Sequence, residues 1–426
     1  MKEHKAHVTR AWVLHPDITS DRSRRAADPA LAEAVALAAA LPGLEVVGAD
    51  VVRLPKPQAG ALFGSGKIEE LADHFKVQEI ELVLVDGPVT PVQQRNLEKA
   101  WGVKLLDRTG LILEIFSDRA ATREGVLQVE MAALSYQRTR LVRAWTHLER
   151  QRGGLGFVGG PGETQIEADR RAIDTQLTRL RRQLTKVQKT RHLHRAARAK
   201  VPFPIVALVG YTNAGKSTLF NHLTGAEVMA KDMLFATLDP TLRRVALPDG
   251  TEAILSDTVG FISDLPTQLV AAFRATLEEV LEADIILHIR DIAHPETEAQ
   301  KASVLAILTE LGVDEATPQV EVLNKVDLLD ADAREAVETR AARADDLFAV
   351  SAVTGRGVER LLADLSARIA GARITEEVSL DWSQGAAQAW LQEQEVVVES
   401  RQGEEGWHLT VRWTPLQKAR FERVLG

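Results

Sequence analysis

The sharpest chemical feature of the sequence is the run GYTNAGKS. It follows the apolar stretch IVALV and precedes STLFNHL, so it joins a strand to a helix as a phosphate-binding loop must. Glycines let backbone N–H groups curve around a phosphate, and the helix N-terminus adds its positive dipole end. Lys216 would reach the β and γ oxygens, and the Ser217 hydroxyl would ligate Mg²⁺. The run predicts a nucleotide phosphate site made of Gly210, Tyr211, Thr212, Asn213, Ala214, Gly215, Lys216 and Ser217.

A second group of residues, DTVG, ends the predicted strand Ala253–Asp257. An Asp at such a place can hold Mg²⁺ through a water, and a Gly N–H can meet the γ-phosphate. We expect Lys216 and Gly260 to stabilise the γ-phosphate, and no side chain in the sequence is an evident general base. The nucleotide-binding residues expected here are Asp257, Thr258, Val259 and Gly260.

Residues that could select the base follow two later strands. The Asp327 carboxylate can accept from N1–H and the 2-amino group of guanine, whereas adenine offers neither donor. The Ala352 backbone N–H can donate to guanine O6. Because ligands collect at the carboxyl ends of parallel strands, we expect a guanine site at this edge. Its residues are Asn324, Lys325, Val326, Asp327, Ser351, Ala352 and Val353.

The connection between the phosphate loop and Asp257 contains FATLDPT, with threonines at 237 and 241. One of them should close onto Mg²⁺ and the γ-phosphate, in a segment that orders with the triphosphate and relaxes after hydrolysis. Spacing does not decide between Thr237 and Thr241. The nucleotide-binding residues expected in this segment are Phe235, Ala236, Thr237, Leu238 and Asp239.

The elements around these residues predict an α/β protein of four parts. Residues 1–116 alternate strands and helices and predict a small parallel α/β domain. Residues 201–373 show six strands with intervening helical patterns and predict a Ras-like G domain that carries the phosphate loop. Residues 374–426 predict a small α+β domain, with a hairpin around Gly403–Gly406.

Residues 117–200 predict an antiparallel helical hairpin. Apolar residues recur at heptad spacing from Leu127 to Leu148 and again from Ile166 to Val187, so each helix can bury the seam of the other. The stretch Gly153–Gln165 has six Gly and one Pro and predicts the tip.

The hairpin is basic inside an acidic protein. The net charge of the 426 residues is −8, but residues 138–200 contain 16 Lys/Arg against 5 Asp/Glu. Such a block indicates an anionic partner, nucleic acid first, or a solvated helical face without a specific role. The sequence has no Cys, no secretory signal and no span long enough for a bilayer, which favours a cytoplasmic protein.

The motifs are typical of translation-factor-class GTPases, and several details resemble the HflX family within the Obg–HflX group. The matching stretches are FATLDPT, DTVGF, GGPGETQIEADRR and LFGSGKIEEL, and the resemblance covers residues 8 to 373. It implies a Mg²⁺-dependent GTPase that cycles between GTP and GDP as a monomer, with Thr237 as the second Mg²⁺ ligand beside Ser217 and with Asp257 acting through water.

The resemblance also implies a partner. Members of the family bind the large ribosomal subunit and split ribosomes under stress, with the hairpin tip near the peptidyl transferase centre. Phe261 stands where many small GTPases have a water-orienting Gln, so we expect slow intrinsic hydrolysis that the ribosome stimulates. Asn213 matches an Asn that some related GTPases use with K⁺.

Two other functions stay open. The GTPase could time release during assembly of the large subunit. The stretch GSGK at Gly64–Lys67 is an imperfect phosphate loop, with Ala61 and Ile68 at positions where the motif needs Gly and Ser or Thr, and it is explained by a tight strand–helix turn. The resemblance nevertheless implies that the N-terminal domain could bind ATP and remodel RNA.

Overall fold

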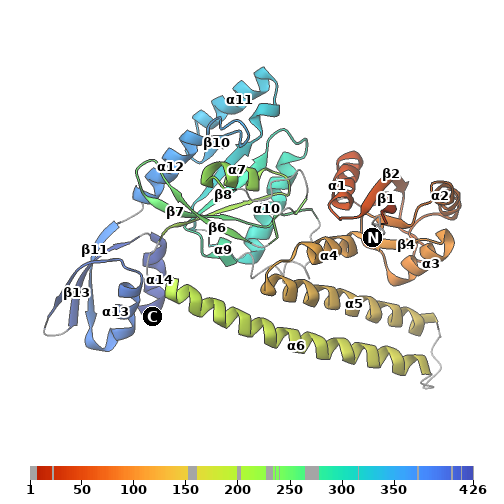
Figure 1. The fold of residues 1–426 in the computed structure, drawn as a ribbon, viewed down its shortest axis with the longest axis horizontal. Helices are drawn as coiled ribbons and strands as arrows, with labels where there is room; N and C mark the ends of the chain where they lie inside the picture. The colour runs from red at the N-terminus through yellow and green to blue at the C-terminus, as the bar shows by residue number, and fades with distance from the viewer. Residues whose placement is uncertain are drawn as a thin grey trace, which may run out of the picture. The chain divides into compact units, whose positions relative to one another are not determined.

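The computed structural model confirms an α/β protein with a parallel N-terminal sheet and a second, larger sheet (Figure 1). It describes residues 7–21, 24–151, 161–198, 203–226, 234–235, 237–238, 240–263, 278–314, 316–371, 374–403, 406–413 and 415–425. One compact unit contains the chain up to Thr185 together with Lys231–Leu238, and a second contains both later sheets. No helix within the described ranges combines the length and the apolarity that crossing a membrane requires.

The N-terminal sheet has four strands in the order β2-β1-β3-β4, and every pair is parallel. Four apolar runs of the sequence predict strands, and each of them becomes a strand of this sheet; they are Val8–Leu14, Leu44–Leu54, Ile80–Val85 and Val103–Leu106. Trp12, Phe75 and Trp101 pack edge to face or tilted in the core of this sheet. The strands are β1 (Thr9–Ile18), β2 (Leu44–Leu54), β3 (Leu82–Val85) and β4 (Lys104–Asp107).

Helical patterns over Ala30–Ala40, Lys67–Phe75 and Val92–Trp101 predict three helices. They correspond to α1 (Ala27–Ala39), α2 (Ser65–Val77) and α3 (Pro91–Trp101). A fourth, α4 (Arg108–Arg119), was not predicted. Its sequence RTGLILEIF has a Gly inside the first turn and a nearly continuous apolar run, which hides the helical period. The Asp107 carboxylate defines its start by accepting from the Gly110 N–H at 2.8 Å.

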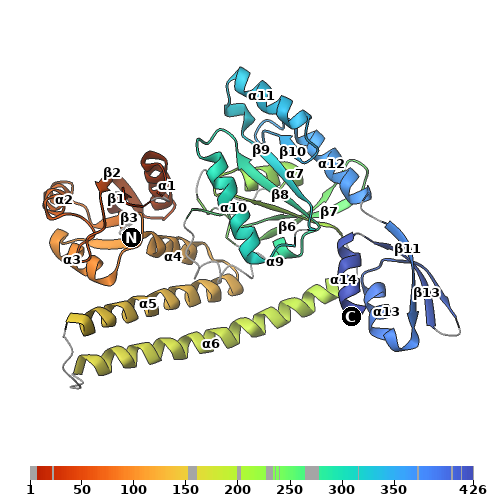
Figure 2. The same ribbon diagram turned by 180° about the vertical axis from the view of Figure 1, so that it is seen from behind.

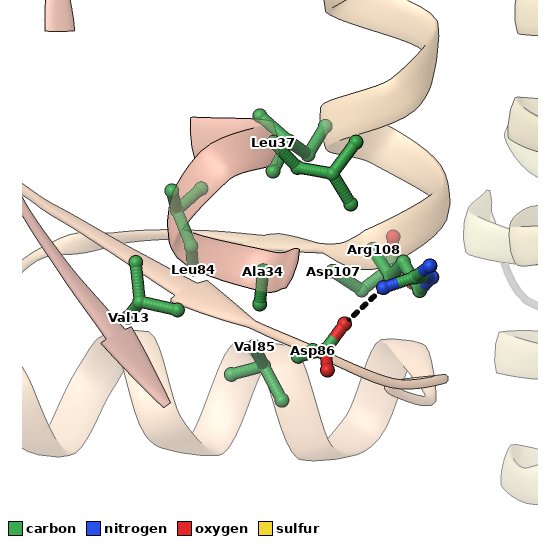
Figure 3. Close-up of a pocket in the computed structure, with 9 residues that line it drawn as sticks. Val13, Ala34, Leu37, Leu84, Val85, Asp86, Asp107 and Arg108 are labelled. Atoms are coloured by element: carbon green, nitrogen blue, oxygen red, sulfur yellow. Dashed lines mark hydrogen bonds and ion pairs between the residues drawn. The ribbon is translucent and has the colours of Figure 1, made fainter. Parts of the chain in front are cut away.

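The carboxyl edge of the N-terminal sheet carries a buried group of charges (Figure 3). Arg108 donates to Asp86 at 2.5 Å and pairs with Glu33, while Nδ1 of His15 lies 2.8 Å from the other oxygen of Asp86. Burial alone would raise the pKa of Asp86, but the His15 hydrogen bond and the Arg108 charge hold that pKa below its ordinary value. A neighbouring cavity of about 10 Å³ has room for a single water and no ligand.

The helical hairpin is confirmed as α5 (Arg123–Gln151) and α6 (Pro161–Arg198), which lie side by side in both views (Figures 1 and 2). Of the described apolar residues of its predicted seam, Leu127, Leu177 and Leu180 are buried, and the others are half-buried: Met131, Leu134, Ile173, Leu184 and Val187. The one charged seam position, Arg138, pairs across the hairpin with Asp174 at 2.8 Å. The ion pair lets a charged residue occupy the seam.

The predicted tip, Gly153–Gln165, is wrong at its far end. The helix α6 already begins at Pro161, and residues 152–160 lie outside the described residues. Proline suits the first helical position because its φ is fixed and the N–H it lacks would have no helical partner there. The Gly at 162 therefore lies inside the first turn of α6 and not in the loop.

The helix α5 is held to the N-terminal sheet by a polar hub at Asp107. One oxygen of Asp107 accepts from the Tyr136 hydroxyl at 2.6 Å, and the other accepts from Arg140 at 3.1 Å. Arg140 also donates to Gln94 of α3 and stacks over the Tyr136 ring. A carboxylate that also caps α4 thus fixes the start of the hairpin.

The second sheet has six strands in the order β10-β9-β8-β5-β7-β6, parallel except for β6, which is antiparallel to β7. It matches the six predicted strands within two residues at each end. The strands are β5 (Ile205–Gly210), β6 (Thr241–Ala246), β7 (Glu252–Asp257), β8 (Ile285–Asp291), β9 (Gln319–Asn324) and β10 (Leu347–Ala349).

Helices of this part are α7 (Lys216–Thr224), α9 (Glu278–Leu281), α10 (Thr297–Leu311), α11 (Ala331–Ala342) and α12 (Val358–Gly371). The sequence pattern also predicts a helix over Leu265–Leu281, and the part of it before α9 lies outside the described residues. The large apolar core joins α7 and α12 to the sheet through Phe220 and Leu361, which are fully buried.

The C-terminal part is the predicted α+β unit, with one strand more than expected. Its strands are β11 (Ile374–Asp381), β12 (Val397–Gln402) and β13 (Gly406–Trp413), in the order β11-β13-β12 and all antiparallel. The two helices are α13 (Gly385–Glu393) and α14 (Pro415–Leu425). The sequence of β11, ITEEVSLD, escaped prediction because its alternating polar residues face away from a core built around Trp413 and Phe421.

Candidate functional site

The predicted phosphate loop connects β5 to α7, as its flanking sequences require. Gly215 has a φ of +91° at the N-cap of α7, and a Cβ there would lie 2.2 Å from Nδ2 of Asn324. A side chain at this position would therefore be strained and would displace Asn324. The glycine brings the loop and the guanine motif into direct contact.

Lys216 lies buried beneath the loop, with 6% of its surface exposed. Its ammonium donates to the carbonyl oxygens of Gly210 at 3.2 Å and Tyr211 at 2.9 Å. Burial lowers the pKa of Lys216 to about 8, and the negative charge of Asp257 opposes that shift. A cation kept out of water in this way gains strongly from a phosphate group.

Ser217 and Asp257 come together as predicted. The Ser217 hydroxyl donates to the fully buried Asp257 carboxylate at 2.7 Å. Hydroxyl and carboxylate oxygens are the hard donors that Mg²⁺ prefers, so these residues fit a Mg²⁺ site that is completed by phosphate oxygens and water. Mg²⁺ bound there would neutralise developing charge on the phosphates.

The residues after β7 are fastened to the phosphate loop. The Thr212 N–H donates to the Phe261 carbonyl at 2.7 Å, and the Phe261 N–H donates to the Gly210 carbonyl at 3.1 Å. Gly260 has no side chain because a Cβ would approach Nζ of Lys216 to 2.9 Å. The Phe261 side chain is buried, with 2% exposed.

One contact of this region was not foreseen. The Tyr211 hydroxyl accepts from the Ser263 N–H at 2.6 Å and lies 2.7 Å from the Ser263 hydroxyl. The sequence contains no signal for it, because the two residues are 52 positions apart and a Tyr at the second loop position is a variable residue of the motif.

The residues predicted to bind guanine lie at the end of β9 and in the loop after β10. Both places are at the same edge of the sheet as the phosphate loop. Asn324 is buried and bridges the two loops: it donates to the Ala214 carbonyl at 2.8 Å and accepts from the Ala352 N–H at 3.0 Å. The Ala352 N–H predicted for guanine O6 therefore has an internal acceptor, which a bound base must share or replace.

The other residues of the motif divide into supporting and accessible ones. Lys325 adopts a left-handed φ of +66° and pairs with Asp291 at 2.8 Å, while Val326 is buried. Asp327 is exposed, as a carboxylate that meets a base must be, and the Val353 side chain is 74% exposed. Among the loop residues, Asn213 is exposed with a φ of +58°, and its role with K⁺ stays a prediction.

The loop predicted to sense the γ-phosphate is described in part. Thr237 and Leu238 are buried, whereas Ala236 and Asp239 lie outside the described residues. Thr241 is the first residue of β6, where it pairs with Asp257 in the antiparallel ladder. The ladder holds Thr241 in a strand, and the choice between Thr237 and Thr241 as the Mg²⁺ ligand stays a prediction.

Four family profiles match successive parts of the chain. Their descriptions are "GTP-binding GTPase N-terminal" for residues 28–117, "GTP-binding GTPase Middle Region" for 119–198, "50S ribosome-binding GTPase" for 205–325 and "HflX C-terminal domain" for 336–426. A protein named GTPase HflX from Magnetococcus marinus is 51% identical over 409 residues, which are 96% of this chain and 93% of that protein. The chain belongs to the HflX family of GTPases.

A further HflX relative agrees with this assignment. GTPase HflX of Escherichia coli is 46% identical over 315 residues, 74% of this chain and 73% of that protein. A solved structure of a GTP-binding protein from Sulfolobus solfataricus with GDP is 22% identical, with a TM-score of 0.45, and covers 85% of this chain and 99% of that chain. The HflX-family chain described above is a GTPase, which hydrolyses GTP to GDP and phosphate.

The exposed carboxylate of Asp327 generates a prediction about base specificity. In Asp327→Asn an amide replaces the acceptor for guanine N1–H and the 2-amino group, so two charge-assisted hydrogen bonds are lost. We expect GTP affinity to fall about 100-fold. Xanthosine triphosphate has a carbonyl where GTP has the 2-amino group, so it should bind the variant more tightly than it binds the natural protein. Competition calorimetry measures both, with ATP as the control that stays weak. Unchanged GTP affinity would contradict the assignment.

The buried ammonium of Lys216 generates a prediction about pH. Below a pKa of about 8 the free site is already protonated, so binding the phosphates takes up no proton. Above it the ammonium must be restored, and GTP affinity should fall by up to about tenfold per pH unit. Titrations at about pH 7 and about pH 9 test this. The control is Lys216→Gln, which should bind GTP weakly at both pH values. The pH dependence of its GTP affinity comes from the nucleotide or from other groups, and it is subtracted from that of the natural protein.

Proposed function

We propose that this HflX-family GTPase binds the large ribosomal subunit in its GTP form and splits ribosomes, and that it acts in the cytoplasm under stress as a monomer. The observation that carries the proposal is the exposed basic face of α6 on a hairpin fastened to the N-terminal domain. The description "50S ribosome-binding GTPase" for the profile that matches residues 205–325 supports the same partner.

The charge of α6 is presented outward. Its seam residues face α5, and most of the cations between them are exposed. They are Arg170, Arg171, Arg179, Arg181, Arg182, Lys186 and Lys189. Exposed cations in a row favour an RNA backbone, where each phosphate contact releases counterions. The residues that connect α5 to α6 would then enter the ribosome first, near the peptidyl transferase centre.

The nucleotide site supports a switch whose rate of GTP hydrolysis depends on its partner. Ser217 and Thr237 would ligate Mg²⁺, Asp257 would act through water, and Gly260 would sense the γ-phosphate. With Phe261 buried and bonded to the loop, no residue described at this site is an evident general base or water-orienting amide. Hydrolysis should therefore be slow alone and faster when the ribosome supplies or orders the missing group.

Ribosome gradients test the proposal. The full chain is incubated with intact ribosomes and GTP, a non-hydrolysable analogue or GDP, and splitting is expected with the first two. Replacing Arg179, Arg181 and Arg182 by Gln should weaken subunit binding at least about tenfold and reduce the salt slope by about 3. The matched control replaces Arg334 and Arg340 of α11 and Arg343, its C-cap residue, by Gln and should change neither. Binding confined to immature large subunits would instead support a role in assembly.

A second candidate, ATP binding by the N-terminal domain, is favoured by one cavity. A space of about 400 Å³ lies beside Gly64, at the N-terminus of α2, and is lined by Arg53, Lys56 and Lys67. Two of these cations already have carboxylate partners, since Arg53 pairs with Asp17 and Lys67 with Glu70, so an anion must compete for them. Saturable ATP binding that survives Asp327→Asn and is lost in Lys56→Gln would support this candidate.

A further inference from the structure

The chain that follows β7 is fastened to the phosphate loop. The pairing of β5 with β7 reaches Leu208 and Asp257, and it resumes as a single parallel bridge between Tyr211 and Phe261. Residues 258–260 are therefore one residue longer than the stretch of chain that they face. Such a bulge redirects a strand, and bulges are frequent beside active sites.

Gly260 lies in this bulge, against the ammonium of Lys216. A Cβ at Gly260 would stand 2.9 Å from Nζ of Lys216 and 2.8 Å from Cγ2 of Thr212, so its backbone lies directly against both. Lys216 donates to two carbonyl oxygens of its own loop. An ammonium has three N–H donors, which leaves a third beyond the bonds made to described residues. The glycine is thus beside the group predicted to bind the γ-phosphate.

Hydrogen bonds of side chains hold this bulge at both ends. Before Gly260, the Thr258 hydroxyl donates to the Leu208 carbonyl at 2.6 Å. After Gly260, the Tyr211 hydroxyl accepts from the Ser263 N–H at 2.6 Å and lies 2.7 Å from the Ser263 hydroxyl. Tyr211 is buried, with 4% of its surface exposed, so water competes little for these bonds. A tyrosine at a variable position of the phosphate loop therefore holds the chain that leaves Gly260.

We propose that Tyr211 is a positioning residue for GTP binding: its hydroxyl holds Ser263 and so keeps the Gly260 N–H in place for the γ-phosphate. The inference rests on the proposed function, in which Gly260 senses that phosphate. A segment that folding has already ordered loses less conformational freedom when the triphosphate binds, so the affinity for GTP rises. GDP has no γ-phosphate for Gly260 to contact, so its affinity does not depend on the bond. The hydroxyl thereby contributes to the discrimination between the two nucleotides.

Dissociation constants of the full chain for GDP and for a non-hydrolysable GTP analogue test this role. In Tyr211→Phe, which keeps the ring and loses the hydroxyl, we expect the constant for the GTP analogue to rise about threefold to tenfold. The constant for GDP should stay within about twofold. Ser263→Ala keeps the N–H donor and should cause a smaller rise for the GTP analogue. In the double variant the two effects should be less than additive, because both substitutions act on one contact.

Tyr136→Phe is the matched control. Tyr136 is the other tyrosine of the chain, and its hydroxyl also makes a hydrogen bond of 2.6 Å, to Asp107. The same chemical change is thereby made outside the nucleotide site, and both constants should stay within about twofold. A shift in this variant equal to that of Tyr211→Phe would indicate a general loss of stability and would overturn the positioning role.

Gly260→Ala separates a failure of this inference from a failure of the function on which it rests. The added Cβ must displace the bulge from Lys216, so binding of the GTP analogue should be weakened more than binding of GDP. If Gly260→Ala weakens both nucleotides equally or neither, the proposed role of Gly260 fails. If it discriminates while Tyr211→Phe weakens both equally or neither, Tyr211 does not position the segment. Tighter binding of the GTP analogue to Tyr211→Phe would also overturn the inference, since the bond would then hold the segment where it hinders the γ-phosphate.

Discussion

The nucleotide site depends on a positive charge that the fold keeps out of water. The Lys216 ammonium is buried beneath its own loop, where two carbonyl oxygens and the nearby Asp257 carboxylate compensate only part of its desolvation. Three neighbours fit around that charge. Gly260 has no side chain to displace the ammonium, the Phe261 backbone bonds to the phosphate loop, and Asn324 donates to a carbonyl of the same loop. The phosphates of a nucleotide would supply the negative charge that the protein alone does not provide for this ammonium.

Much of this site could be predicted because each of its motifs is a short run of consecutive residues. A phosphate loop needs a strand before it and a helix after it, and both are local patterns. Sequence spacing could not show that Thr241 is part of a strand, which only the ladder between β6 and β7 reveals. The Asn324 bridge and the Tyr211–Ser263 contact join distant positions, which no local pattern reports.

The missed elements of the fold have a common cause. Prediction relied on the contrast between apolar and polar positions, and α4 and β11 both weaken it. Arg108 is buried in α4 because Asp86 and Glu33 neutralise it, so a charged residue belongs to the interior. In β11, one face is polar and exposed, and Leu380 is its one fully covered residue. The hairpin was easier to predict, since its heptad spacing persists over many turns.

The antiparallel direction of β6 has a mechanical consequence. Because β6 runs opposite to β7, its first residue lies beside Asp257, the last residue of β7. The chain therefore enters β6 at the carboxyl edge of the sheet, beside a residue predicted for the nucleotide site. Any slip in the register of β6 against β7 would displace the backbone next to Asp257.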